Sequence, residues 1–263
     1  MRSWSGLHLS KCYVDCVGDA GDWAIAYHAR LRWGPVALGY ASLLGRRGPD
    51  GPWSASTLRP GPAPTADPGY VAWNTPALRL NVSARSRSEP FGRRLLEGTA
   101  GTVDWDCLAP SAEVSLRSGS GPGWSGLGYG ERLEVRCPSW RLPIEQLRWG
   151  RFLTPTRTVV WIGWWGAEPR TLVFDNGRCQ ADAEIGDGEV RFGRSRLTLD
   201  RQAVVRDADL AEILKPLARL RALPLAEAAR IHETKWLSRG TLHDPTLSEP
   251  VDGWVIHELV VFP

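Results

Sequence analysis

The fold is decided by a strictly alternating stretch near the N-terminus, Trp23-Ala24-Ile25-Ala26-Tyr27-His28-Ala29-Arg30-Leu31-Arg32-Trp33. Its odd-numbered residues are apolar or aromatic, and its even-numbered residues from His28 onward are basic. An alternation with a period of two predicts a β-strand with one buried face. Gly34-Pro35 ends the strand, and residues 36–44 form the next one, so the chain opens with a hairpin or meander.

Short runs of the same kind recur along the rest of the chain, separated by turn residues. They lie at 77–82, 102–107, 112–116, 129–135, 147–153, 158–165, 171–174, 190–192, 197–199, 231–242 and 254–262. Many short strands at this spacing are typical of a β-sandwich or β-barrel. The sequence therefore predicts an all-β protein.

One helix interrupts the pattern near the C-terminus, at about residues 209–220. Asp209 is its expected N-cap, with Glu212 placed to bond back to it. Leucine and isoleucine residues follow on one stripe, and Pro216 kinks or splits the helix. The chain thus has one predicted helix among its strands.

The length of 263 residues suits one large β domain or two smaller ones. A division near Pro138 to Pro143 gives two β-rich halves, residues 1–138 and 139–263, the second of which contains the helix. No sequence repeat links the halves.

The composition excludes several classes of function. A net charge of +3, with acidic and basic residues mixed along the chain, argues against a nucleic-acid partner. No segment approaches the roughly 18 apolar residues of a membrane span, and residues 1–11 lack the apolar run of a signal peptide, so we expect no transmembrane segment and a cytoplasmic location. The pattern does not indicate an oligomeric state.

The cysteines and the glycine-rich stretches suggest no metal or cofactor. The five cysteines are expected to be free, buried thiols, and Cys12 and Cys16 are too isolated from other ligands to indicate zinc. Gly123-Trp124-Ser125-Gly126 has its second glycine one position too early for a nucleophile elbow. The glycines that follow do not lie between a strand and a helix, so they form no dinucleotide fingerprint.

A carboxylate lies within an apolar row of the run 129–135. Tyr129 and Glu131 share one face of this strand with Leu133 and Val135. If that face points inward, burial raises the pKa of Glu131 and allows it to act as a general acid near neutral pH. Alternatively, Glu131 faces outward and pairs with Arg132 or another arginine.

The last predicted strand repeats this arrangement. Glu258 belongs to one of its rows and His257 to the other, so whichever row faces inward takes one ionisable group with it. Such a group is a candidate for positioning water or accepting a proton. The alternative is a hydrogen-bonded structural residue.

Fourteen tryptophans exceed what packing alone usually requires. Aromatic faces bind flat or conjugated ligands and stabilise positive charge, which predicts an apolar pocket lined by aromatic residues. The candidates for contact with a ligand are Trp23, Tyr27, Trp105, Trp149 and Trp161. Each of them could instead fill the core.

Residues 126–132, Gly-Leu-Gly-Tyr-Gly-Glu-Arg, resemble the Gly-x-Gly-Tyr-x-Asp-His stretch of the carotenoid 1,2-hydratase (hydroxyneurosporene synthase) superfamily. The opening residues 11–44 look like that family's first strands. The resemblance implies two lipocalin-like β domains packed together, and enzymes that hydrate carotenoid double bonds or act as cyclases or Diels–Alder catalysts. Tyr129 matches the family tyrosine and Glu131 replaces its aspartate, whereas Arg132 stands where the family has histidine.

These observations favour a cofactor-independent enzyme that acts on a hydrophobic polyene, terpenoid or polyketide by acid-assisted hydration, cyclisation or double-bond isomerisation. Glu131 would donate the proton with assistance from Tyr129, and His257 or Glu258 would position water or accept a proton. Two alternatives stay open: a non-catalytic lipocalin-like carrier of a hydrophobic small molecule, and a pericyclase that works by positioning alone.

Overall fold

The structure is a computed structural model that describes residues 6–48, 51–99, 101–119, 123–138, 142–213 and 230–263. Across these residues the chain is built almost entirely of antiparallel strands, and it divides into two compact units, Met1–Arg141 and Leu142–Pro263. The predicted all-β fold is confirmed, with two curled, lipocalin-like sheets. No helix within the described ranges is long and apolar enough to cross a membrane.

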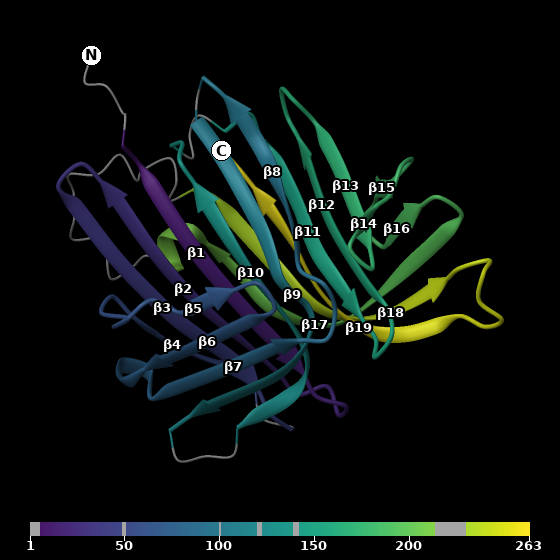
Figure 1. Cartoon of the computed structure of the whole chain (residues 1–263), viewed down its shortest axis with the longest axis horizontal. Coiled ribbons are helices and arrows are strands. Elements are labelled where there is room, and N and C mark those ends of the chain that lie inside the picture. The colour runs from purple at the N-terminus through teal and green to yellow at the C-terminus, as the bar shows by residue number, and fades with distance from the viewer. Residues whose placement is uncertain (1–5, 49–50, 100, 120–122, 139–141, 214–229) are drawn as a thin grey trace. The chain divides into compact units, whose positions relative to one another are not determined.

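The described part of unit 1 contains a 10-stranded sheet (Figure 1). Its strands are β1 (His8–Val17), β2 (Trp23–Trp33), β3 (Val36–Arg46), β4 (Trp53–Thr57), β5 (Thr65–Asp67), β6 (Tyr70–Thr75), β7 (Leu80–Ser86), β8 (Phe91–Gly98), β9 (Gly101–Ser118) and β10 (Trp124–Val135), with a short 3-10 helix, η1 (Pro76–Leu78). The order is β4-β3-β2-β1-β10-β9-β7-β6-β5, and β8 pairs with β9. The last long strand of the unit therefore lies beside its first.

One face of this sheet carries a core of small and branched side chains. The buried members from the first strands include Val14, Cys16, Ala24 and Ala26, and Trp73 packs with them from β6. Alanines bring little bulk, so a strongly curled sheet can close over them. His28, expected on the polar face of β2, is also buried here, because the first half of β2 is covered on both faces.

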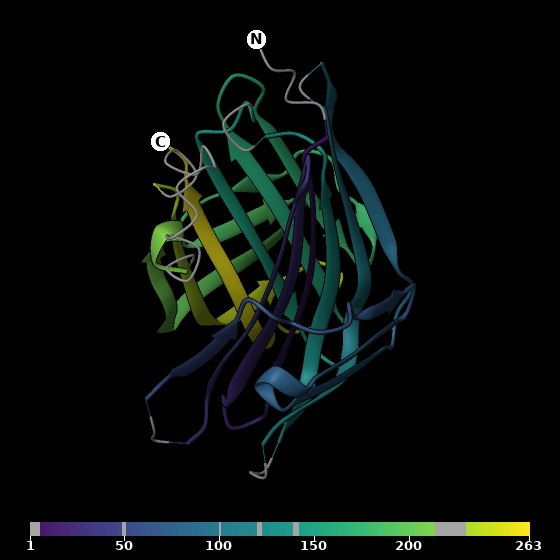
Figure 2. The same cartoon turned by 90° about the vertical axis from the view of Figure 1, so that its left-hand side faces the viewer.

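The described part of unit 2 contains a 9-stranded sheet. Its elements are β11 (Gln146–Leu153), β12 (Thr158–Trp165), β13 (Arg170–Asp175), β14 (Arg178–Cys179), β15 (Glu184–Ile185), β16 (Glu189–Phe192), β17 (Ser195–Asp209), α1 (Leu210–Ile213), β18 (His232–His243) and β19 (Val251–Val261). The order is β14-β13-β12-β11-β19-β18-β17-β16-β15. The turned view shows the green and yellow strands of this unit curling across one another (Figure 2).

The core of unit 2 lies on one face of its sheet and contains large side chains. Phe152, Trp161, Phe192 and Val255 are its main members, together with branched residues of β12, β13 and β16. Successive strands supply them at alternate positions, as the period of two requires.

The structure changes two local predictions. The runs 102–107 and 112–116 belong to one long strand, β9, and a register shift opposite β10 lets that strand continue through Pro110. The predicted helix begins at Leu210, directly after Asp209, and residues 214–220 of it lie outside the described residues. The Asp209 carboxylate accepts a hydrogen bond from His232 at 2.8 Å.

Candidate active site

The glycines of the motif 126–132 bring strand β10 close to strand β1. A Cβ atom at Gly128 would lie 2.0 Å from the carbonyl oxygen of Asp15, and one at Gly126 would lie 2.3 Å from that of Val17. Real Cβ atoms do not approach backbone so closely, so only glycine permits this spacing. The glycines occupy the core face of β10, and the residues between them point to the opposite face, which we call the tyrosine face.

The register between β10 and β9 shifts on both sides of Gly130, between Gly128 and Gly130 and again between Gly130 and Glu131. Irregularities of this kind bend a strand and redirect its side chains, and they are common beside functional sites. Tyr129 and Glu131 flank the shift, and both are buried.

Two hydrogen bonds converge on one oxygen of the Glu131 carboxylate. The hydroxyl of Tyr129 donates to Oε2 at 2.7 Å, and the indole N–H of Trp105 donates to the same atom at 2.8 Å. Donors aimed at a carboxylate stabilise its ionised form, whereas burial favours the neutral acid. The two bonds therefore fix Oε2 of Glu131 as an acceptor.

The neighbours of Glu131 remain protonated at neutral pH. Burial raises the pKa of Tyr129 well above its ordinary value, and Cys107 and Glu131 raise it further. Burial likewise raises the pKa of the Cys107 thiol, which is hydrogen-bonded to Tyr129. Tyr129 is thus fixed as a neutral donor to the carboxylate.

A second tyrosine–carboxylate pair lies on the adjacent strand. The Tyr13 hydroxyl donates to Oδ2 of Asp15 at 2.7 Å, and Asp15 is fully buried. In the β1–β10 register Tyr13 stands opposite Glu131, and Asp15 stands opposite Tyr129. The two pairs therefore run antiparallel, and the carboxylates occupy diagonal positions, whose typical separation is about 7–8 Å.

The tyrosine face extends across six strands in one row. From β3 to β8 the row comprises Ser42, Tyr27, Tyr13, Glu131, Cys107 and Phe91. Tyr13 packs edge-on against Tyr27 at 5.1 Å and against Tyr129 at 6.1 Å, measured between ring centroids. Glu131 thus lies in a row that contains several aromatic residues, and two of its aromatic neighbours, Trp105 and Tyr129, are hydrogen-bonded to it.

Two buried polar atoms on the tyrosine face have no hydrogen-bond partner among the described residues. They are the indole Nε1 of Trp23 and the hydroxyl of Ser42. Burying such a group without a partner costs about 1–3 kcal/mol. The indole N–H could donate a further hydrogen bond, and the hydroxyl could donate or accept one.

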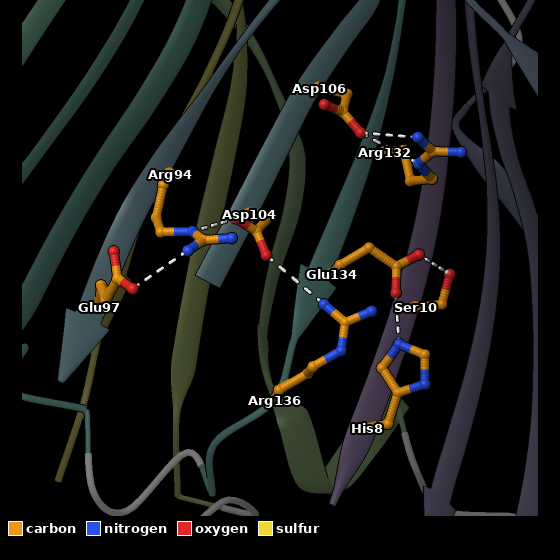
Figure 3. A network of polar contacts seen from close by, with 9 residues as sticks. All are labelled: His8, Ser10, Arg94, Glu97, Asp104, Asp106, Arg132, Glu134 and Arg136. Carbon is orange, nitrogen blue, oxygen red and sulfur yellow. Dashed lines mark hydrogen bonds and ion pairs between the residues drawn. The ribbon is translucent and has the colours of Figure 1, made fainter. Parts of the chain in front are cut away.

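Arg132, which stands where the resemblance would place histidine, lies on the opposite face from Glu131. Its guanidinium donates to Asp106 at 2.8 Å and to the backbone oxygen of Ala66 at 3.3 Å. Figure 3 shows this pair beside two separate groups of polar contacts, one of which joins Glu134 to Ser10 and His8. The described bonds of Arg132 thus hold it on Asp106 and Ala66, on the face opposite the Glu131 carboxylate.

His257 lies on the core face of unit 2. Its Nε2 is 2.9 Å from the hydroxyl of Ser238, and its ring stacks on Trp236 at 5.1 Å. Burial lowers the pKa of His257 to about 3, and the positive charges of Arg201 and Lys235 lower it further. The imidazole is therefore neutral at physiological pH.

Glu258 points to the other face of the same strand, where it forms an ion pair with the Lys235 ammonium. Lys235 also contacts Glu233 at 3.2 Å, and Glu233 accepts a hydrogen bond from Arg206 at 3.1 Å. The two rows of β19 thus carry one ionisable group each, as the alternation indicated, and each group is held by partners within unit 2.

The nine candidate residues divide between the units. Unit 1 holds five of them on the tyrosine face: Trp23, Tyr27, Trp105, Tyr129 and Glu131. In unit 2, Trp161 belongs to the core with His257, and Trp149 lies opposite Glu258 on the other face. Sequence reasoning missed Tyr13 and Asp15, although their Tyr-x-Asp spacing repeats the Tyr-x-Glu spacing of residues 129–131.

No protein-family model matches the sequence, and no curated protein matches it. Several solved structures, in contrast, match the fold of this chain. The crystal structure of CghA with Sch210972 has a TM-score of 0.57 at 12% identity, covering 97% of this chain and 89% of that one. The Nitrosomonas europaea protein NE1406 has a TM-score of 0.52 at 9% identity, covering 98% and 93%.

Kievitone hydratase from Nectria haematococca has a TM-score of 0.52 at 10% identity, covering 98% of this chain and 89% of that one. At these identities the likeness is one of fold. The fold that the motif at residues 126–132 implied is thereby confirmed.

Proposed function

We propose that the chain is an enzyme that protonates a carbon–carbon double bond of a hydrophobic polyene, terpenoid or polyketide, and that the reaction takes place on the tyrosine face. The observation that carries the proposal is the buried Glu131 carboxyl group with two donors on Oε2. The fold it shares with kievitone hydratase supports the proposal, as does the motif at residues 126–132.

As the neutral acid, Glu131 would transfer its carboxyl proton to one carbon of the double bond, leaving a carbocation at the other carbon. The carboxylate that remains is stabilised by the bonds from Tyr129 and Trp105. The ring of Tyr13, which stands opposite Glu131 in the β1–β10 register, would stabilise the positive charge. Acid–base chemistry of this kind needs no organic cofactor.

Asp15 would complete the reaction by accepting a proton. In an isomerisation or cyclisation the proton comes from a carbon next to the cation, and in a hydration it comes from the water that attacks the cation. Glu131 and Asp15 occupy diagonal positions on the same face of the sheet, so both carboxyl groups would act on one bound substrate. Exchange with solvent then restores the proton on Glu131 and removes the one on Asp15.

The test begins with native mass spectrometry of protein purified from its host, to identify a co-purified hydrophobic ligand. Purified protein is then incubated in D2O with a hydrophobic extract of the host, and the products are analysed for incorporated deuterium. We expect Glu131→Gln to reduce incorporation by about 10²–10⁴-fold. Glu134→Gln, which lies three residues along the same strand but on the other face, should keep the wild-type rate.

A folded Glu131→Gln variant with wild-type turnover would refute the acid role. Retained turnover in that variant would favour a pericyclase, and ligand retention without turnover in the wild type would favour a carrier. Asp15→Asn separates the two halves of the mechanism, because it should block product formation while the transfer from Glu131 stays possible.

A further inference from the structure

On the core face of unit 2, the carboxylate of Asp187 lies between two arginines, Arg148 and Arg201. Arg148 of β11 donates to Oδ1 of Asp187 at 3.0 Å, and Arg201 of β17 donates to the same oxygen at 2.7 Å. Strands β19 and β18 lie between β11 and β17 in the sheet, so the two guanidinium groups converge from different parts of it. Asp187 belongs to the turn that joins β15 to β16.

The arginines are fixed by neighbours other than Asp187. The guanidinium of Arg201 lies over the ring of Trp236 at 4.1 Å, and Trp236 in turn stacks on His257. Arg148 also donates to the carbonyl oxygen of Gly186 at 3.3 Å. Such a fixed pair is preorganised for a planar carboxylate.

The charge at this place is not balanced. Arg148 and Arg201 carry two positive charges and Asp187 one negative charge, and His257 between them is neutral at physiological pH. The nearby Glu189 is paired with Arg191 and Arg196 and does not neutralise the pair.

Asp187 lies on an exposed turn, where the two arginines hold its carboxylate. Its side chain is 63% exposed, and it lies between Gly186 and Gly188, at the second of which a Cβ would meet open space. Ion pairs at exposed positions add little to stability. An external carboxylate can therefore displace it at small cost.

An apolar surface adjoins the arginines. Gly163 stands opposite Arg148 in the β11–β12 register, and the indole of Trp165 lies 3.3 Å from the Cβ position of this glycine. Trp165 is among the few large apolar side chains exposed in the described structure, and Ile185 packs beside it.

We propose that unit 2 contains a binding site for an aromatic carboxylate, in which the ligand's carboxylate replaces that of Asp187 between Arg148 and Arg201 and its ring lies against Trp165. The site is separate from the tyrosine face and does not depend on the reaction proposed there.

The probe is 2-naphthoate, titrated at low salt and followed by calorimetry and tryptophan fluorescence, with 2-naphthylmethanol as its neutral counterpart. We expect Asp187→Asn to bind naphthoate about fivefold more tightly, because it no longer competes for the arginines. Arg148→Gln and Arg201→Gln should each weaken binding by about tenfold. Arg191→Gln, an arginine of the same hairpin that is paired with Glu189, should change nothing.

Trp165→Ala should weaken naphthoate more than acetate, since only naphthoate has a ring to place there. Glu131→Gln should bind naphthoate as the wild type does, which separates this test from that of the reaction. If the wild-type protein bound 2-naphthylmethanol as tightly as 2-naphthoate, the proposal would be overturned, and no variant would be needed for that conclusion. Failure of both the wild type and Asp187→Asn to bind naphthoate would also overturn it.

Discussion

The hydroxyl of Tyr129 donates a 2.7 Å hydrogen bond to Glu131, two residues further along the same strand, and both side chains are buried. Tyr129→Phe removes the donor and leaves the ring in place. We expect the free energy of unfolding to fall by about 1–3 kcal/mol, because the carboxyl group loses a buried partner. Urea unfolding followed by tryptophan fluorescence measures the change.

Tyr70→Phe is the matched control for that substitution. Tyr70 lies in β6 and contacts Arg85 through its ring, which phenylalanine retains. Equal destabilisation by the two variants would contradict a specific contribution from the Tyr129 hydroxyl.

Gly150 permits a close contact in unit 2. A Cβ there would lie 2.2 Å from the Trp161 ring and 2.7 Å from the Cβ of His257. Gly150→Ala should therefore lower the free energy of unfolding by about 1–3 kcal/mol through overpacking. Gly188→Ala, which meets open space, should leave the urea midpoint within error, and a similar loss in both variants would show that the effect is not one of packing.

The two buried histidines predict a loss of stability in acid. Burial lowers the pKa of His257 to about 3 and that of His28 to about 4, from an ordinary value of 6.5. The unfolded chain takes up a proton at each histidine below pH 6.5 while the folded chain does not, so stability is present above pH 6.5 and falls toward the folded pKa. Each histidine contributes a slope of up to about 1.4 kcal/mol per pH unit.

His257→Asn should reduce this slope between pH 6.5 and 4.5, as measured by urea unfolding at a series of pH values. His243→Asn, at an exposed position at the end of β18, should leave it unchanged. An unaltered slope in His257→Asn would mean that the imidazole does not resist protonation in the folded protein.

The thiols differ sharply in accessibility. All five cysteines are free, but Cys179 is exposed, contrary to the expectation that all are buried. Burial raises the pKa of Cys12 to about 12 and that of Cys137 to about 11, which suppresses their reactive thiolates. A thiol reagent should modify one cysteine rapidly in the native protein and all five in denaturant, and Cys179→Ser should abolish the rapid phase.

The period of two was sufficient to predict most strands, because it follows from the geometry of the backbone. It predicted β2 with its observed bounds, whereas β12 was predicted from a short run that is apolar on both faces. It could not show that the first half of β2 is buried on both faces, since His28 on an isolated strand is indistinguishable from an exposed residue. Burial depends on what the rest of the chain places over a strand.

The candidate site was predicted in part for the same reason. The alternation placed Glu131 beside Tyr129 and showed that His257 and Glu258 face opposite ways. The alternation does not show which distant strands pair with each other. It therefore could not reveal that Asp15 lies opposite Tyr129, although 114 residues separate them in the sequence. The same limit hid the partner of Glu258, because the Lys235 contact depends on the β18–β19 register.

The glycines at positions 126 and 128 lie on the core face of β10, behind the residues that would carry the chemistry. Any side chain there would push β1 away and separate Asp15 from Tyr129, without touching a substrate. Residues on the core face of the sheet thus influence the distance between Asp15 and Glu131 on the tyrosine face. Substitutions behind the strand could adjust the reaction while every polar group of the tyrosine face is kept.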